Sequence, residues 1–295
     1  MKKIFTTIFM VAIGVISSFA QVYTIGSIPN DASMGTVTME MPNQGKILPG
    51  AFSVNATKKV RFSPGNLQYQ ASTKTWRFAS NQYDYIGDAN SNISSTYTGW
   101  IDLFGWGTSG YNGKNPYMTT ALGSIYGNGS TNIAGTNYDW GVYNAISNGG
   151  NAKGLWRTLT KNEWNYLFNS RTNYNKLWSF ATVNGISGVV LLPDSWFLPS
   201  GLTFTAASKD FGTNVYTVAQ WTKMENAGAV FLPAAGNRTG TSVSNVGSIG
   251  YYWSSTCSSS DNAYKVSFSS GDLYPSNYSD LYRYEGRSVR LCAEF

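Results

Sequence analysis

The chain has 295 residues, of which 42% are hydrophobic, 15% aromatic and only 12% charged. A chain of this length and composition can bury a substantial core and is too apolar to be intrinsically disordered. Its formal net charge is +6, but the basic residues are scattered along the chain, which argues against a nucleic-acid-binding surface.

The N-terminus has the pattern of a secretory signal peptide. Two lysines precede an apolar run over residues 4–16, and small residues ending at Ala20 form a cleavage site. The run is too short for a typical membrane-spanning helix, and no later segment is apolar enough to be one. We therefore expect residues 1–20 to be removed and the mature protein to have no transmembrane segment. It would be secreted or lie at the cell surface, extracellular or associated with an outer membrane.

Residues 21–50 are predicted to form a short β-hairpin-like segment and a linker. Residues 22–25 and 35–41 read as two short strands around a turn at Pro29, and the Pro- and Gly-containing residues 42–50 follow. A lone hairpin of this size is marginally stable. The segment is therefore either a pair of lead-in strands packed on the main domain or a separate small unit.

The main domain is predicted to span residues 51–295, with a β-rich α+β architecture, two short helices and long loops. Alternating apolar residues predict early strands at Lys59–Phe62, Leu67–Tyr69 and Thr75–Phe78. Residues 84–114 form a long loop whose aromatic residues, including Phe104 and Trp106, predict that it packs on the body. A short helical or irregular turn is expected at Tyr138–Ile146.

The clearest helix is predicted over residues 161–169. Thr160 and Glu163 have the spacing of a capping box, in which each side chain satisfies a backbone N–H of the other residue. Trp164 and Leu167 begin an apolar stripe on one face of this helix. A second helix is predicted near Tyr216–Met224.

Later strands are predicted at Gly188–Leu192 and Ala229–Pro233, and residues 234–249 are expected to form a loop. Two further strands, Gly250–Thr256 and Gly286–Cys292, frame the C-terminal region.

Residues 250–295 combine this frame with an unusual composition. Of the 27 residues Ser258–Tyr284, 18 are Ser, Tyr, Asp or Asn. These types form poor cores, but they suit a binding surface, because Tyr gives rigid contact area and small polar residues give adaptable hydrogen bonds. The residues expected to be buried as the frame are Trp253, Val266, Phe268, Val289 and Leu291. The sequence predicts a variable surface on a fixed frame.

The two cysteines, Cys257 and Cys292, lie in the two strands that frame this tract. In an oxidising compartment they could form a disulfide, and two free buried thiols are the alternative. Spacing alone does not establish the geometry that a bond needs.

Several segments resemble one family. Trp156–Leu167 resembles the Leu-Pro-Thr-x-x-Glu-Trp helix of C-type-lectin-like domains in the formylglycine-generating-enzyme branch. Segments that resemble the later strands of these domains are Val230–Gly236, Gly250–Ser255 and Gly286–Leu291. The resemblance covers residues 156–295 and implies a C-type-lectin-like fold. Residues 52–106 resemble secreted proteins of Bacteroides-type gut bacteria, many with the Fibrobacter major-paralogous-domain pattern.

Some members of this fold are variable proteins of diversity-generating retroelements. Adenine-directed mutagenesis rewrites their C-terminal strands and loops, and codons of the Asn type become Ser, Tyr, Asp or Gly codons. This palette is similar to that of Ser258–Tyr284. The resemblance implies such diversification here; composition alone does not show it.

The candidate ligand-binding residues are the Tyr, Asp and Asn side chains of the tract: Tyr264, Tyr274, Tyr278, Tyr282, Tyr284, Asp261, Asn262, Asp272, Asn277 and Asp280. Tyr is enriched at binding hot spots. We expect non-catalytic recognition of a protein or glycan at a cell surface, without a cofactor. The alternatives are a solvated hairpin with some Tyr packed inward, Tyr264 above all, and a structural or adhesive component without a discrete ligand site.

An enzyme and a calcium-dependent lectin are the other readings. Histidine is absent from the sequence, which removes the usual general base. The formylglycine-generating relatives use a pair of active-site cysteines, and here neither thiol has a second one near it in sequence. Carboxylate pairs such as Asp84 with Asp139, or Asp194 with Glu225, have no distinctive spacing. Residues 88–92 resemble the start of a calcium loop but lack its central Gly and distal Glu, so we expect no metal.

Overall fold

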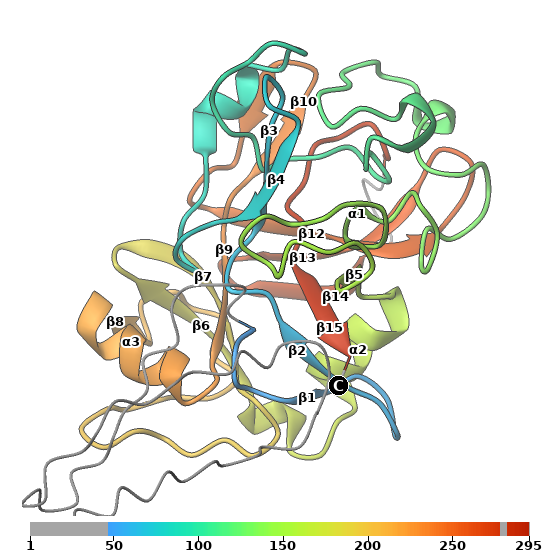
Figure 1. Cartoon of the computed structure of the whole chain (residues 1–295). Helices are drawn as coiled ribbons and strands as arrows, with labels where there is room; N and C mark the ends of the chain where they lie inside the picture. Colours follow the sequence, from blue (N-terminus) through green and yellow to red (C-terminus); the bar gives the residue numbers. More distant parts are fainter. Residues whose placement is uncertain (1–46, 278–281, 295) are drawn as a thin grey trace, which may run out of the picture. The chain divides into compact units, whose positions relative to one another are not determined.

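The computed structural model describes residues 47–277 and 282–294, which belong to one compact unit (Figure 1). It contains few helices and many strands in several sheets, which confirms the α+β class. The predicted signal peptide and nearly all of the predicted N-terminal segment lie outside the described residues. No helix within the described ranges is long and apolar enough to cross a membrane.

The C-terminal strand lies inside a four-stranded antiparallel sheet whose other three strands all come from residues 52–158. The strands, in spatial order, are β1 (Phe52–Ser53), β2 (Lys59–Phe62), β15 (Leu291–Glu294) and β5 (Arg157–Thr158). Cys292 pairs with Phe62 on one side and with Arg157 on the other. The last strand therefore closes the domain against its first strands.

The second four-stranded sheet is formed by the middle of the chain. Its strands, in order, are β8 (Val215–Tyr216), β6 (Trp178–Val183), β7 (Ile186–Leu191) and β9 (Val230–Pro233). Strands β6 and β7 form a hairpin whose two turn residues, Asn184 and Gly185, both have positive φ, at 51° and 79°. An Asn-Gly pair suits such a turn because both positions need a left-handed backbone.

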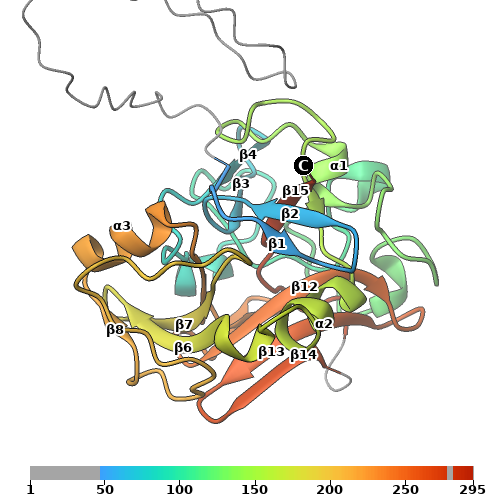
Figure 2. The ribbon, with the colours of Figure 1, turned by 90° about the horizontal axis from the view of Figure 1, so that it is seen from below.

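The third sheet is formed by the C-terminal region. It contains three antiparallel strands, β12 (Ile249–Cys257), β13 (Ala263–Ser269) and β14 (Asp272–Asn277). Figure 2 shows helix α2 (Lys161–Asn169) lying against this sheet. Much of the tract expected as a display is therefore regular strand, with β14 at its edge.

Short elements complete the fold. Two hairpins form, from β3 (Leu67–Gln70) with β4 (Thr75–Phe78) and from β10 (Asn237–Thr239) with β11 (Ser242–Ser244). The remaining helical elements are α1 (Trp140–Tyr143), α3 (Val218–Asn226) and the 3-10 turns η1 (Gly87–Ser91), η2 (Tyr111–Gly113), η3 (Gly123–Ile125) and η4 (Tyr174–Lys176).

The capping boxes confirm both predicted helices. In α2, which begins and ends as predicted, Thr160 Oγ1 accepts from Glu163 N at 3.2 Å, and Glu163 Oε2 accepts from Thr160 N at 2.8 Å. Thr217 and Gln220 form the same arrangement at the start of α3. These local contacts satisfy N–H groups that a helix start leaves without partners.

Three hydrophobic clusters hold the sheets together. The first joins α2 to the first, second and third sheets and contains Trp164, Leu232 and Phe268. The second lies under the long loops and contains Phe104, Trp106 and Trp253. The third packs α3 on the second sheet. The long loop predicted at residues 84–114 is thus packed on the body through its aromatic residues, as expected.

Three boundaries differ from the predictions. Leu48, in the predicted linker, is fully buried and donates from its backbone N to Phe62 O at 3.2 Å, so the body begins before residue 51. The predicted loop 234–249 contains the β10–β11 hairpin. In the predicted strand Gly286–Cys292, residues 286–288 form only isolated bridges, because they pair with separate segments of the fold.

Candidate functional site

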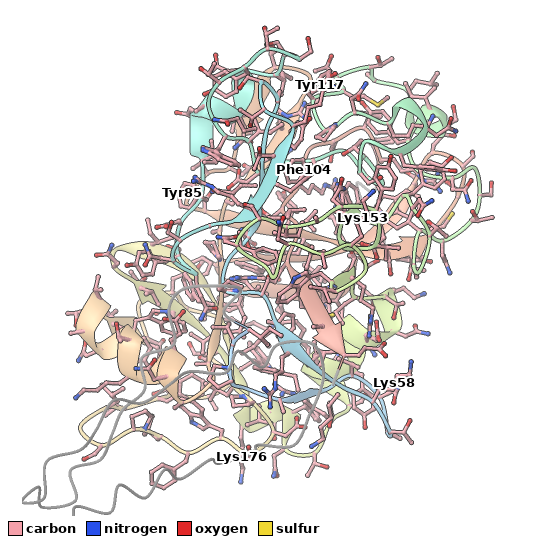
Figure 3. The ribbon with its side chains drawn as sticks, viewed as in Figure 1. Lys58, Tyr85, Phe104, Tyr117, Lys153 and Lys176 are labelled. Carbon is pink, nitrogen blue, oxygen red and sulfur yellow. The ribbon has the colours of Figure 1, made fainter. Side chains whose placement is uncertain are left out.

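The frame predicted for the C-terminal region is buried. Trp253, Val266, Val289 and Leu291 are fully buried, and Phe268 is 1% exposed. Trp253 Nε1 donates to Phe104 O at 2.7 Å, and Phe104 N donates to Arg287 O at 2.9 Å. Phe104 is labelled in the upper half of the view in Figure 3. The long N-terminal loop therefore supports the frame from the side away from α2.

Strand β13, in the middle of the third sheet, is buried on both faces, and Ser267 on the face opposite Phe268 is only 5% exposed. Phe268 points into the first cluster. On the other face, Ser267 pairs with Tyr251 on β12 and with Tyr274 on β14, so these three residues share one row. The side chain of Tyr274 is 51% exposed, and its hydroxyl donates to Asp272 Oδ1 at 3.3 Å. The edge strand thus presents an aromatic ring beside a carboxylate.

Two further aromatic rings lie at the start of the second described range, residues 282–294. The rings of Tyr282 and Tyr284 are stacked, with centroids 5.1 Å apart and planes at 16°. Tyr282 is 45% exposed, whereas Tyr284 is half-buried and burial raises the pKa of its hydroxyl. Tyr282 forms an isolated bridge with Asn262, which places this pair beside the start of β13.

Arg283, between the two stacked tyrosines, points inward and ties them to the body. It is fully buried, and its guanidinium lies over the ring of Trp106 at 4.3 Å. It donates to the carbonyl oxygens of Tyr126 (3.1 Å), Gly129 (2.6 Å), Ser259 (2.5 Å) and Asn262 (3.2 Å) and to Cys257 Sγ (2.8 Å). Three loops are thereby held at fixed positions around Tyr282 and Tyr284.

A segment that sequence reasoning did not assign to the surface also lies here. A Cβ atom at Gly123 would come within 2.4 Å of Asp261 O, so the two backbones are in close contact. Asn132 Oδ1 accepts from Cys257 N at 2.8 Å. Leu122, next to Gly123, is 50% exposed. Nothing in the local sequence of residues 122–132 indicated this position, which depends on long-range contacts.

The remaining predicted residues divide into three groups. Tyr264 is half-buried and has the Lys161 ammonium of α2 over its ring at 4.1 Å, so one face of this ring is already covered. Asp272 is exposed, and Asp261 and Asn262 are half-buried. Tyr278, Asp280 and the side chain of Asn277 lie outside the described residues. We call Asp261, Asp272, Tyr274, Tyr282 and Tyr284 the C-terminal surface.

The disulfide suggested for Cys257 and Cys292 does not form: both cysteines are free. The reason is topological. Cys257 ends β12 in the third sheet and contacts Arg283, whereas Cys292 is fully buried in β15 of the first sheet, next to Arg157 O. Burial raises the pKa of the Cys292 thiol, which keeps it protonated.

The carboxylates considered for catalysis have structural partners. Asp139 accepts from Thr158 N at 2.9 Å and from Gly141 N at 3.4 Å, at the start of α1. Asp194 accepts from Ser53 N and forms ion pairs with Lys59 at 3.2 Å and Arg171 at 3.4 Å. These contacts join separate elements of the fold.

Asp84 and Glu225, the other two members of the carboxylate pairs, also have structural partners, and so does the calcium-like stretch. Asp84 accepts from Asn81 N at 2.9 Å, and Glu225 accepts from Gln82 Nε2 at 3.0 Å. The calcium-like stretch forms the 3-10 turn η1, in which Asn90 Nδ2 donates to Asp102 Oδ1 at 2.8 Å. Among the described residues, no three His, Cys, Asp or Glu side chains are grouped to hold a metal ion.

Comparison with known proteins gives one similarity. A family model described as a domain of unknown function (DUF8237) matches residues 208–292, which is less than half of the chain. The matched region runs from the loop before β8 into β15 and includes the whole C-terminal surface. No curated protein and no solved structure matches the chain.

Proposed function

We propose that this protein binds a protein or glycan ligand at a cell surface, without catalysing a reaction, through the C-terminal surface. The observation that carries the proposal is the exposure of Tyr274 and Tyr282, at 51% and 45%, on a frame whose own residues are buried. Large exposed aromatic side chains are costly to leave in water and contribute strongly to binding when a partner covers them. A rigid support lowers the entropy lost on binding.

We also propose that the domain has a C-type-lectin-like fold and that a retroelement diversifies its C-terminal strands. In support, three of the four segments on which the resemblance rests meet in the first hydrophobic cluster, to which α2 contributes Trp164, β9 Leu232 and β12 Tyr252. The fourth segment contributes Val289 and Leu291 to the second cluster. Secretion through the N-terminal signal sequence would bring the surface to its ligand. A template copy of residues 250–295 beside a reverse transcriptase gene, with adenines at the tyrosine codons, would establish the diversification.

The first prediction concerns the tyrosines. Combined Tyr274→Ala and Tyr282→Ala substitution should abolish binding of ligands selected on a glycan and protein array and leave the thermal midpoint nearly unchanged, because both side chains are largely exposed. Tyr174→Ala is the matched control, since Tyr174 is 40% exposed on η4. A large loss of stability would mean that the tyrosines are core residues. An array without any reproducible ligand would favour a structural or adhesive component.

A further inference from the structure

In the C-terminal region the basic side chains are buried, whereas some of the acidic side chains are accessible to solvent. Residues 257–290 contain four basic and four acidic residues, so their formal charges cancel in the sequence. The four basic residues, Lys265, Arg283, Arg287 and Arg290, are each at most 1% exposed. A ligand approaching from solvent therefore meets the hydroxyl, amide and carboxylate groups of this region and none of its cations.

Two carboxylates of this region remain available. Asp272 is exposed and Asp261 is half-buried, and neither forms an ion pair with any residue in the described ranges. Glu285, by contrast, is bound to Arg287. The accessible charge of the C-terminal surface is thus negative, although the chain as a whole carries a formal charge of +6.

Tyr274 and Asp272 combine this charge with an aromatic ring. They lie two residues apart on the edge strand β14, so their side chains share its outward face, and the hydroxyl of Tyr274 contacts Asp272 Oδ1 at 3.3 Å. A cation placed there would meet a carboxylate and a ring face together. This chain already uses such contacts at partly exposed rings: Arg77 lies over Trp100 at 3.7 Å.

We infer that the ligand of the C-terminal surface is a polypeptide segment that presents lysine or arginine to Tyr274 and Asp272. The inference rests on the proposed binding function and narrows it from a protein or glycan to a basic protein segment. An acidic ligand would be repelled by the unpaired carboxylates. A neutral glycan would bind through hydrogen bonds, and its affinity would depend little on ionic strength.

Lys209 provides a second test, in which removing a charge should raise the affinity for a cationic ligand and not lower it. Its side chain is exposed, and its carbonyl accepts from Gly271 N at 2.9 Å, directly before Asp272. Its ammonium forms no ion pair with Asp272. An exposed lysine at this position should weaken the attraction for a cationic ligand, so its neutralisation should strengthen binding.

The experiment compares two probes, an alternating lysine–threonine peptide and the matched glutamate–threonine peptide, by calorimetric titration at low and at physiological ionic strength. The lysine peptide should bind more tightly, and salt should weaken it, because exposed charges are screened over about 8 Å at 0.15 M. Asp272→Asn should reduce its affinity roughly 1.5- to 5-fold, and Lys209→Gln should increase it to a similar extent. Asp88→Asn, at an exposed carboxylate on η1, should leave it unchanged.

Equal binding of both peptides, or a Lys209→Gln variant that binds the lysine peptide less tightly, would overturn the cationic-ligand inference. A different result would contradict the proposed binding function itself. If Tyr274→Ala and Tyr282→Ala change the binding of no probe and no array ligand, the surface is not a binding site. If they weaken binding of a glycan or an acidic peptide while Asp272→Asn does not, only the charge of the ligand was inferred wrongly.

Discussion

At the scale of single residues, buried charged groups hold long loops in place. Asp102 is fully buried; its carboxylate accepts from Ile86 N at 2.9 Å and from Asn90 Nδ2 at 2.8 Å. Burial nevertheless raises the pKa of this carboxyl to about 6, because the hydrogen bonds compensate only part of the lost hydration. The sequence predicted only the loop 84–114 that contains Asp102, because the burial of a carboxylate cannot be predicted from its neighbours in the sequence.

This pKa makes stability depend on pH. Because the folded-state pKa lies above the ordinary value of 3.8, the contribution of Asp102 is fully present below about pH 4 and is lost as the pH rises through about 6. The Asp102→Asn variant lacks this titration. The free energy of unfolding of the wild type relative to the variant should fall by roughly 2–3 kcal/mol between about pH 4 and pH 7. Urea unfolding of both proteins across this range measures it, and parallel pH profiles would contradict it.

At the scale of elements, a helix was predicted accurately where the local sequence contained both a capping motif and a regular apolar spacing. The capping box of α2 and the spacing of Trp164 and Leu167 predicted the helix with its observed bounds. Strand β6 was missed, although the Asn184-Gly185 turn after it was a usable hairpin signal. Strand β14 was also missed, because its polar edge-strand sequence with Pro275 has no apolar alternation to detect.

The capping box gives a prediction at this scale. Thr160→Ala removes the hydroxyl that accepts from Glu163 N and should lower the free energy of unfolding by about 1 kcal/mol. Thr222→Ala, inside α3 on its exposed side, is the control and should have little effect, since its hydroxyl only returns to Val218 O. Chemical denaturation measures both. An equal change in the two variants would show that the cap contributes nothing specific.

At the scale of the whole molecule, the two cysteines belong to different sheets. Cys257 lies beside Arg283 at the C-terminal surface, and Cys292 is buried between β2 and β5. The topology sends the chain from the third sheet back to the first, and this path separates two residues whose positions in the sequence suggested a staple. The frame is therefore held by packing and by the hydrogen bonds of Arg283.

The separation of the thiols can be measured directly. Protein purified without reductant and unfolded in denaturant should titrate two free thiols, and reductant should leave the midpoint of unfolding unchanged. In the native state Cys292 should react with thiol reagents only as fast as the protein unfolds, because it is fully buried. A single bonded species after denaturation would contradict the arrangement of the two sheets.

The amino-acid sequence alone was sufficient for the α+β class, for α2 and for the burial of the frame residues such as Phe268 and Leu291. These features follow from capping and apolar spacing between near neighbours. The pairing of β15 with β2, the five hydrogen bonds of Arg283 and the burial of every cation in residues 257–290 required the tertiary structure. Each of these features depends on contacts between residues far apart in the chain. The exposure of a side chain and the charges around it are therefore set only when the chain folds.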